Sequence, residues 1–284
     1  MKPKNILLIL LTLALLSACT PVTQAAPPAA GVEVVPALAV TPAPLPTQPP
    51  TTTLRPTDPP AAPTRPPLII HSPLAGMTYA DLQSSVVNPF NPPPAGSDDP
   101  HHGVDLAMID NGIALAGQPV QAMLPGNVAA VITDRFPYGN ALIIETPLSV
   151  LPSGLVTTLS SVSQGPAAQT SALTCPPVSY PWQENLEKSL YILYAHLLEA
   201  PTVQAGQPVS GGQLIGSSGA SGNALNPHLH LEARLGPAGA SFTSMAHYDP
   251  SASSDEMAAY CTWRISGIFS LVDPMLLFAQ IAVE

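Results

Sequence analysis

Short apolar runs separated by glycine, proline and asparagine recur along the chain from about Leu68 onward. Short runs bounded by such residues are typical of strands rather than helices. The pattern therefore predicts a domain that is mainly β, with few short helices. The runs lie at residues 120–124, 127–132, 141–145, 190–197, 214–216 and 228–234.

One short helix is expected at the end of the chain. Asp273 is suited to an N-cap, and Pro274 follows it where proline is favoured in the first turn. The largely apolar residues 275–281 come next and would form the helix.

Two stretches do not fit this pattern of strands. Residues 147–188 are rich in Ser, Pro and Gln, and residues 235–266 also contain no strand-like run. We expect both stretches to be insertions carried on the surface of the domain.

The N-terminus has the features of an export signal. Two lysines precede an apolar run from Ile6 to Leu16, and small residues follow. The run is too short to cross the ~30 Å hydrocarbon core of a membrane as a helix; a truncated membrane helix is the alternative. Residues 16–19, Leu-Ser-Ala-Cys, resemble the lipobox of bacterial lipoproteins. This resemblance implies that Cys19 is lipidated, begins the mature chain and attaches it to a membrane.

A stretch rich in proline and threonine, without any aromatic residue, fills residues 20–67. It cannot bury enough apolar surface to offset its ordering entropy, so we expect an extended, disordered tether. A spacer without a tuned length is an equally open interpretation. The chain thus divides into a signal peptide (1–18), a lipidated cysteine with its tether (19–67) and a folded domain (68–284).

The charge balance excludes one class of partner. The chain has 8 Lys and Arg against 18 Asp and Glu, with a formal net charge of −10. Phosphate-binding surfaces need clusters of basic residues, and none is present. We therefore reject nucleic acid as a partner.

Four of the 7 histidines lie in two short segments. The later segment holds His228 and His230, which point to the same face if the segment is a strand. The earlier one holds His101 and Asp105, which would be ~13 Å apart in an extended chain. The chain must curl for both to reach one metal, and Gly103 permits the backbone angles needed.

Together the two segments supply the ligands of a mononuclear zinc site with one position open for water. Each has an alternative when taken alone. A His-x-His pair is weak evidence for a metal, and a His and an Asp can meet by chance in a polar loop.

Further motifs accompany these residues in a fixed order. Tyr-x-His-Leu contains His196, Gly-x-x-Val-x-x-Gly-x-x-Ile-Gly spans residues 206–216, and Pro-His-Leu-His-Leu-Glu spans residues 227–232. With His-x-Gly-x-Asp at 101–105, they resemble the lysostaphin/LytM-type zinc endopeptidases of bacterial cell walls. Gly-Gln-Pro-Val-Gln-Ala from residue 117 and Val-Asp-Pro at 272–274 are similar to further segments of that family.

The resemblance implies a fold, a cofactor and a role for each matching residue. It implies an antiparallel sheet with a groove over a zinc ion. His101, Asp105 and His230 match the zinc ligands, while His196 and His228 match two catalytic histidines that do not bind the metal. We favour His228 as general base and His196 as hydrogen-bond donor to the oxyanion, although the roles could be exchanged.

Other polar residues near these motifs receive weaker assignments. Glu232 could orient an imidazole from outside the metal's first shell, or could equally lie on a strand surface. Tyr194 shares a strand face with His196 and could line the cleft, but packing is the favoured role. We assign no catalytic role to His71, His102 or His247.

The function implied is a lipid-anchored zinc metalloendopeptidase of the cell envelope that hydrolyses peptide cross-links of peptidoglycan. One departure from the family concerns the substrate cleft, because residues 88–94 replace a common Gly-aromatic-Gly-x-Arg segment. The first alternative is a non-catalytic envelope lipoprotein that activates a separate amidase, which retention of all five site residues disfavours. The second is a tethered structural lipoprotein with an accidental metal site.

The two remaining cysteines lie one in each insertion. Export places them where disulfides persist, and lipidation of Cys19 leaves an even pair. We therefore expect a Cys175–Cys261 disulfide that joins the two insertions. Two separate buried thiols are the alternative.

Overall fold

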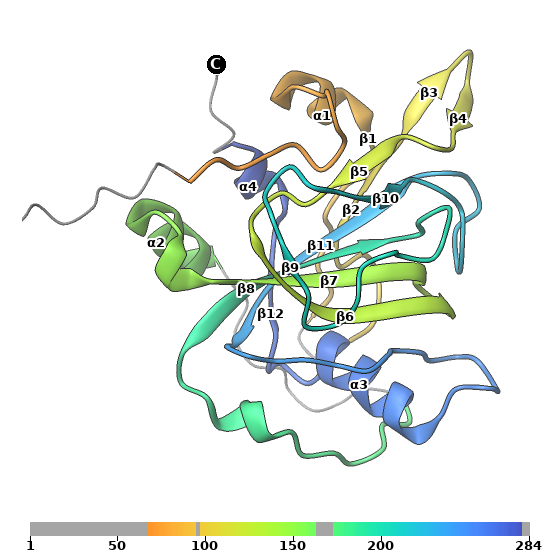
Figure 1. Cartoon of the computed structure of the whole chain (residues 1–284). Helices are drawn as coiled ribbons and strands as arrows, with labels where there is room; N and C mark the ends of the chain where they lie inside the picture. Colours follow the sequence, from red (N-terminus) through yellow and green to blue (C-terminus); the bar gives the residue numbers. More distant parts are fainter. Residues whose placement is uncertain (1–67, 95–96, 163–172, 280–284) are drawn as a thin grey trace, which may run out of the picture. The chain divides into compact units, whose positions relative to one another are not determined.

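The main sheet runs through the middle of the folded domain and is antiparallel at every pairing (Figure 1). Its strand order is β1-β2-β11-β8-β7-β6-β9, with β12 pairing alongside β11. The computed structural model describes residues 68–94, 97–162 and 173–279. The signal, Cys19 and the tether lie outside these ranges, so their boundaries remain predictions.

The elements of the described residues follow one another along the chain with short connections. They are α1 (Tyr79–Ser85), β1 (Val86–Asn88), β2 (Val104–Leu106), β3 (Met108–Asp110), β4 (Ile113–Leu115), β5 (Pro119–Gln121), β6 (Gly126–Arg135), β7 (Gly139–Pro147), the 3₁₀ turn η1 (Leu148–Val150), α2 (Ser153–Val162), the 3₁₀ turn η2 (Pro181–Glu184), β8 (Lys188–Ala195), β9 (Pro208–Val209), β10 (Leu214–Ser217), β11 (Leu229–Pro237), α3 (Ser254–Arg264), β12 (Ser270–Val272) and α4 (Met275–Phe278).

The strands of the sheet centre are apolar on both faces, because a core lies on each side. Alternate residues of β8 show this, since side chains two apart point to the same face. The first core contains Leu190, Ile192 and Tyr194. The second contains Tyr191, Leu193 and Ala195.

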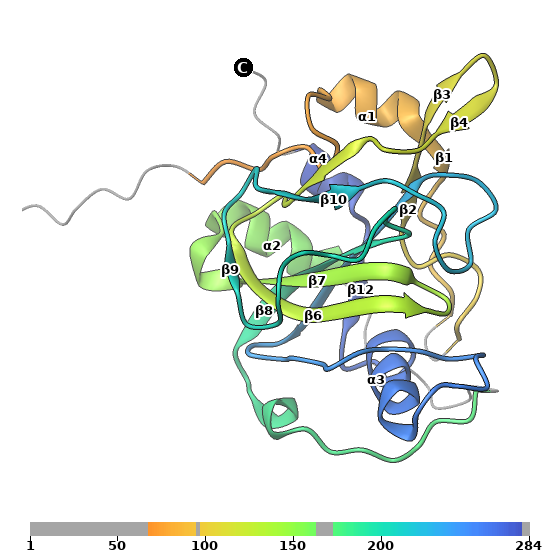
Figure 2. The same ribbon diagram turned by 45° about the vertical axis from the view of Figure 1, so that its right-hand side comes forward.

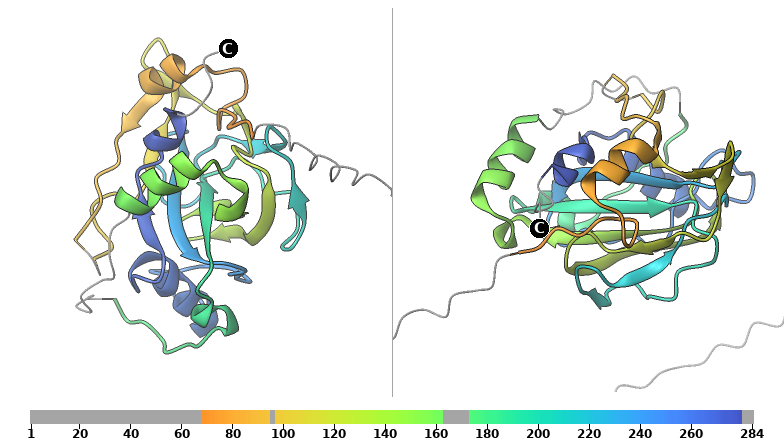
Figure 3. Two further views of the ribbon diagram at one scale, coloured as in Figure 1. Left: turned by 90° about the vertical axis from the view of Figure 1, so that its left-hand side faces the viewer. Right: turned by 90° about the horizontal axis from the view of Figure 1, so that it is seen from above.

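The helices are divided between the two faces. Buried leucines of α1, α2 and α4 belong to the first core, whereas the buried aromatic residues of α3 belong to the second. Figures 1 and 3 show α3 on one side of the strands and α1 and α4 on the other. The mainly antiparallel β fold predicted from the sequence is confirmed. None of the helices in the described ranges is long and apolar enough to cross a membrane.

The two expected surface insertions are packed more deeply than we predicted. The first forms α2, in which Leu155 and Leu159 lie one turn apart and are buried against the sheet. The second contains the end of β11 and α3, where Tyr260 and Trp263 are almost fully buried. The prediction was wrong here because both stretches carry apolar residues at helical spacing, which the search for strand-like runs overlooked.

The C-terminal helix is present but short. α4 covers Met275–Phe278, and the carboxylate of Asp273 accepts a hydrogen bond from the N–H of Met275 at 2.9 Å. Residues 280–281, the end of the predicted helix, lie outside the described ranges.

Two small hairpins accompany the main sheet. β3 pairs with β4, and β5 pairs with β10. Figure 2 shows the β3–β4 hairpin projecting from one end of the sheet.

Gly103 serves a different purpose from the one expected. Its φ is not positive, so it does not supply a left-handed turn. Instead, a Cβ at this position would collide with the carbonyl oxygen of Leu231 on the neighbouring strand. Glycine is therefore required for close approach of the two backbones beside the site.

Replacing Gly103 with alanine is expected to destabilise the domain by about 1–3 kcal/mol, because the backbones must move apart. Equilibrium unfolding in denaturant measures the effect. Gly154→Ala is the control, because nothing lies within 4 Å of a Cβ there and its φ is not positive. Equal stability of the two variants would contradict this interpretation.

Candidate metal centre

Two neighbouring strands place a histidine directly opposite an aspartate. β2 and β11 are antiparallel, and their register pairs Asp105 with His230. The flanking residues of both strands, such as Val104 and Leu231, point into the first core. Asp105 and His230 therefore share the opposite face, where His230 Nδ1 lies 2.7 Å from Asp105 Oδ1.

His101 approaches the same carboxylate from just before β2. Its backbone forms a bridge with Asn91, and its Nδ1 donates to the carbonyl oxygen of Pro89 at 2.9 Å. His101 Nε2 then lies 3.1 Å from Asp105 Oδ1 and 3.2 Å from His230 Nδ1.

These three side chains form a donor set that suits zinc. The donor atoms of His101, Asp105 and His230 lie within 4.8 Å of one another. The second nitrogen of each imidazole is already held by an oxygen, of Pro89 for His101 and of Glu232 for His230. In the neutral imidazoles the inward nitrogens therefore present lone pairs toward the carboxylate, an arrangement that needs a cation at its centre. Two imidazoles and one carboxylate match zinc's preference and leave one position open.

When no cation is bound, a proton on His230 offsets part of the negative charge of the Asp105 carboxylate. Burial disfavours charge on His230, but its hydrogen bonds with Asp105 and Glu232 outweigh burial and raise its pKa to about 9. Burial also opposes charge on Asp105, yet the hydrogen bonds from His101 and His230 hold the pKa of its carboxyl far below the usual range. Metal binding near neutral pH therefore displaces a proton from His230.

The remaining two motif histidines lie beside this cluster. His196 follows β8 with a left-handed φ of 60°, and its ring centroid lies 4.8 Å from that of His228 and 5.7 Å from that of His230. His228 Nε2 lies 3.6 Å from Asp105 Oδ1. The structure thus brings together all five histidine and aspartate residues singled out from the sequence.

The hydrogen bonds of these two histidines fix their tautomers. His196 Nδ1 donates to the carbonyl of Ser221 at 2.7 Å, and His228 Nδ1 donates to the carbonyl of Asn226 at 2.8 Å. In each neutral ring, Nε2 is then the acceptor. Burial lowers the pKa of His196 to about 3, so its ring is neutral.

All five side chains line a cleft of about 240 Å³. Asn88 lies in its wall and donates to Asp105 Oδ2 at 3.0 Å, leaving Oδ1 for the metal. Asn88 is the first residue of the segment 88–94, which replaces the Gly-aromatic-Gly-x-Arg segment common in the family. This part of the cleft wall therefore differs from the family pattern.

Glu232 is fully buried rather than exposed on a strand surface. It follows His230 by two residues and shares its face of β11. Its carboxylate accepts from His230 Nε2 at 3.1 Å and from Arg264 Nη1 at 2.7 Å. Arg234, Tyr138 and Trp263 donate to it as well. Although burial opposes ionisation, Arg234 and Arg264 hold the pKa of this carboxyl well below its usual range.

Sequence reasoning missed most of this polar network. Arg234 could have been found, because it continues the alternation of His230 and Glu232 along one face of β11. Arg264 has no such pattern. It reaches the site from the end of α3 and is held by Asp98, whose Oδ1 accepts from Arg264 Nε at 2.6 Å.

The other residues considered from the sequence lie outside the cleft. Tyr194 points into the first core, where its hydroxyl accepts from the N–H of Met123, so it has a packing role. His102 is buried and accepts from Arg234; its Nε2 has no hydrogen-bond partner among the described residues. The rings of His71 and His247 contact Gly212 and the carbonyl of Thr174.

Cys175 and Cys261 are joined in a disulfide, with Cα atoms 5.9 Å apart. Cys261 lies in α3, three residues before Arg264. The bridge thus ties the segment before η2 to the helix that supplies Arg264 to the site.

Replacing Glu232 with glutamine is expected to weaken zinc binding by ~10–100-fold, because His230 loses a charged orienting partner. The change should also cost about 3–5 kcal/mol of stability, since the buried Arg234 and the partly buried Arg264 lose their shared counter-charge. Zinc titration against a competing chelator and denaturant unfolding measure the two effects. Glu145→Gln is the control. The Glu145 carboxylate that it replaces also accepts several hydrogen bonds but contacts no metal donor. Unchanged zinc affinity in Glu232→Gln would contradict the orienting role.

Comparison with known proteins agrees with the motifs. Residues 184–242 match the family model described as Peptidase family M23. The match includes His196, His228, His230 and Glu232.

Several solved structures are similar to this chain. A mutant catalytic domain of the prophage-encoded M23 protein EnpA from Enterococcus faecalis is 21% identical, covering 54% of this chain and 81% of that one, with a TM-score of 0.32. The catalytic domain of the antimicrobial peptidase lysostaphin from Staphylococcus simulans is 17% identical, covering 72% and 98%, with a TM-score of 0.36. A zinc-containing peptidase from Vibrio cholerae is 25% identical, covering 52% and 32%, with a TM-score of 0.30.

Proposed function

We propose that this protein is a lysostaphin/LytM-type metallopeptidase of family M23 that hydrolyses the peptide cross-links of bacterial peptidoglycan. The observation that carries the proposal is the cleft itself. Three donor atoms of a zinc site, from His101, Asp105 and His230, lie beside two further imidazoles. A structural zinc site would have a fourth protein ligand and would not need these additional acceptors.

His101, Asp105 and His230 would hold the zinc. Zinc at this position supplies Lewis-acid chemistry, which lowers the pKa of water toward ~7 and polarises a peptide carbonyl. The residues around it orient the donors. Asn88 and Glu232 each hold one side chain of the set, so the imidazoles and the carboxylate keep their directions as substrate enters.

The surroundings of His196 and His228 support the exchanged assignment of their roles, whereas their Nδ1 hydrogen bonds are alike. Burial keeps the ring of His196 neutral, so its Nε2 is an acceptor. That arrangement suits a general base that takes a proton from the attacking water. His228 Nε2 lies 3.6 Å from Asp105 Oδ1, beside the metal donors, and we assign this residue as the donor to the oxygen that becomes negative.

Zinc analysis and digestion of purified peptidoglycan test the function. The mature protein should contain one zinc per chain and release soluble fragments, with new amino and carboxyl termini within the peptides. Chelation should stop the release, and added zinc should restore it. Fragments cut between sugar and peptide, or zinc-loaded protein that cuts nothing, would refute the proposal.

Lipidation of Cys19 is the second part of the proposal, supported by the Leu-Ser-Ala-Cys sequence after the apolar run. Cys19→Ser should move the protein from the membrane fraction to the soluble fraction, because the acyl chains no longer anchor it. Fractionation followed by mass spectrometry of the N-terminal peptide measures this. Membrane retention of the variant, or a native N-terminus without acyl groups, would rule it out.

A further inference from the structure

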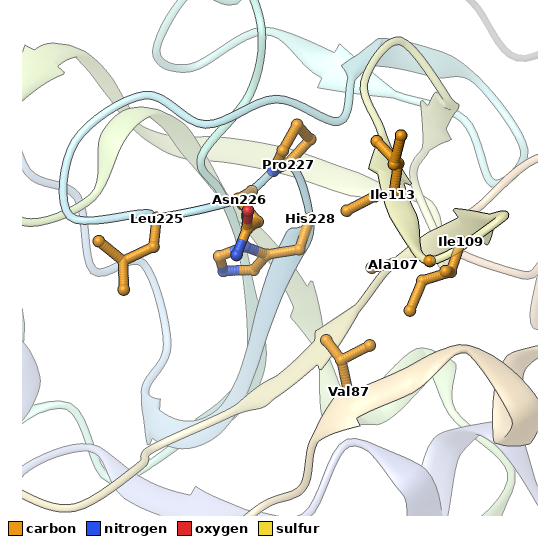
Figure 4. A pocket seen from close by; sticks show the side chains of 10 residues that line it. Val87, Ala107, Ile109, Ile113, Leu225, Asn226, Pro227 and His228 are labelled. Atoms are coloured by element: carbon orange, nitrogen blue, oxygen red, sulfur yellow. Dashed lines mark hydrogen bonds between the residues drawn. The ribbon is translucent and has the colours of Figure 1, made fainter.

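An apolar pocket of about 580 Å³ lies next to the metal cleft. Its walls come from the β3–β4 hairpin, from β1 and from the loop before β11. Figure 4 shows Ile109 and Ile113 of the hairpin and Val87 of β1 around one side, with Pro227 and His228 facing them. None of the side chains that line the pocket carries a formal charge, and His228 is the one titratable group among them.

The alkyl groups of this pocket are unusually exposed. Ile109 is 58% exposed, Ile113 is 67% exposed and Leu225 is 99% exposed. Large apolar residues cluster on the surface of a domain chiefly where another molecule covers them. Ile109 and Ile113 of the β3–β4 hairpin are thus part of an exposed apolar surface at the pocket.

The position of His228 indicates which ligand this is. Its ring lines both the apolar pocket and the metal cleft. Its Nε2 is 3.6 Å from Asp105 Oδ1, which is one of the donor atoms of the metal cleft. A peptide with its carbonyl at the metal would pass this imidazole, and successive Cα atoms are only ~3.8 Å apart. A side chain within two residues of the cleaved bond then reaches the pocket.

We propose that this pocket binds an aliphatic side chain of the peptide substrate, within two residues of the cleaved bond. The inference rests on the proposed function and adds a selectivity to it. Glycine leaves the pocket unfilled, and a charged side chain would lose its hydration there without gaining a partner. Ile109 and Ile113 are the specificity-determining residues.

Synthetic peptides test this with the full mature chain carrying Cys19→Ser. One parent peptide is made with glycine, or with alanine, leucine or lysine in either configuration, at each of the two positions on either side of the cleaved bond. The zinc-loaded enzyme should prefer an aliphatic residue over glycine by ~10-fold or more in kcat/KM at one of these positions. Ile113→Ser should reduce that ratio toward one.

Leu214→Ser is the matched control, because Leu214 is 62% exposed on β10 and lies outside the lining of the pocket. The control should keep the aliphatic preference. Equal cleavage of all peptides by the unsubstituted enzyme, or the same loss in both variants, would overturn the inference.

Peptide binding to the zinc-free protein, measured by calorimetry, separates this inference from the proposed function. Tighter binding of aliphatic peptides by the zinc-free protein, together with no cleavage by the zinc-loaded protein, would retain the pocket and refute the hydrolase. Cleavage of all the peptides at the same rate would retain the proposed hydrolase and refute the pocket. Should Ile113→Ser instead reduce binding to phosphatidylglycerol–phosphatidylethanolamine vesicles with peptide selectivity intact, the hairpin would be a membrane contact and the inference would be wrong.

Discussion

Asp105→Ala should leave the protein without zinc and without hydrolytic activity. Asp105 supplies the only carboxylate of the three-donor cluster, and its Oδ1 lies within 3.1 Å of the inward nitrogens of both His101 and His230. Removing it takes away a ligand and the negative charge that offsets the dication. Changes outside the first shell already cost ~10–100-fold in metal affinity, so the loss here should exceed ~100-fold.

Elemental analysis and competition with a chelator measure the loss of zinc, and peptidoglycan digestion measures the loss of activity. Asp105→Asn tests whether the charge or the shape matters, because it keeps the size of the side chain. Asp110→Ala is the control, since Asp110 is exposed on the β3–β4 hairpin. A full equivalent of zinc in Asp105→Ala would show that the metal is held elsewhere.

His196→Ala and His228→Ala should each retain zinc but lose most of the hydrolysis. Neither residue belongs to the three-donor cluster. Loss of a general base typically costs ~10²–10⁴-fold, and loss of a donor to the oxyanion ~10²–10³-fold in kcat. His247→Ala is the control, because its ring lies at the Thr174 carbonyl outside the cleft.

The pH profile of kcat/KM distinguishes the two roles. A variant that lacks the base loses the acidic limb of the profile, and a variant that lacks the proton-bearing donor loses the alkaline limb. We expect the first outcome for His196→Ala. Loss of the acidic limb in His228→Ala instead would restore the assignment first favoured from the sequence, and near-normal rates in either variant would exclude that residue from the chemistry.

The sequence determined the class of fold and which residue types are available at the site. His101, Asp105 and His230 stand in short segments whose residue types suit a zinc site. Strand-like runs predicted most of β5 to β8, β10 and β11, because alternation and turn residues are local properties. The Cys175–Cys261 pairing expected from export and cysteine number is also the pairing that the structure has.

Only the tertiary structure decided what surrounds the metal donors. Whether Glu232 was exposed depended on α3, which packs over that face of β11 and brings Arg264 and Trp263 to its carboxylate. No local pattern links these residues, because they are about thirty positions from Glu232 in the chain and the intervening segment has no fixed periodicity.

The same reason accounts for the other differences. Gly103 resembled a turn glycine in the sequence, but the requirement comes from a carbonyl of Leu231, far along the chain. The isoleucines of the β3–β4 hairpin form a pocket only because the loop before β11 stands opposite them. Sequence patterns fix which side chains are available and which face of their own element they occupy, whereas packing between distant segments decides which of them meet.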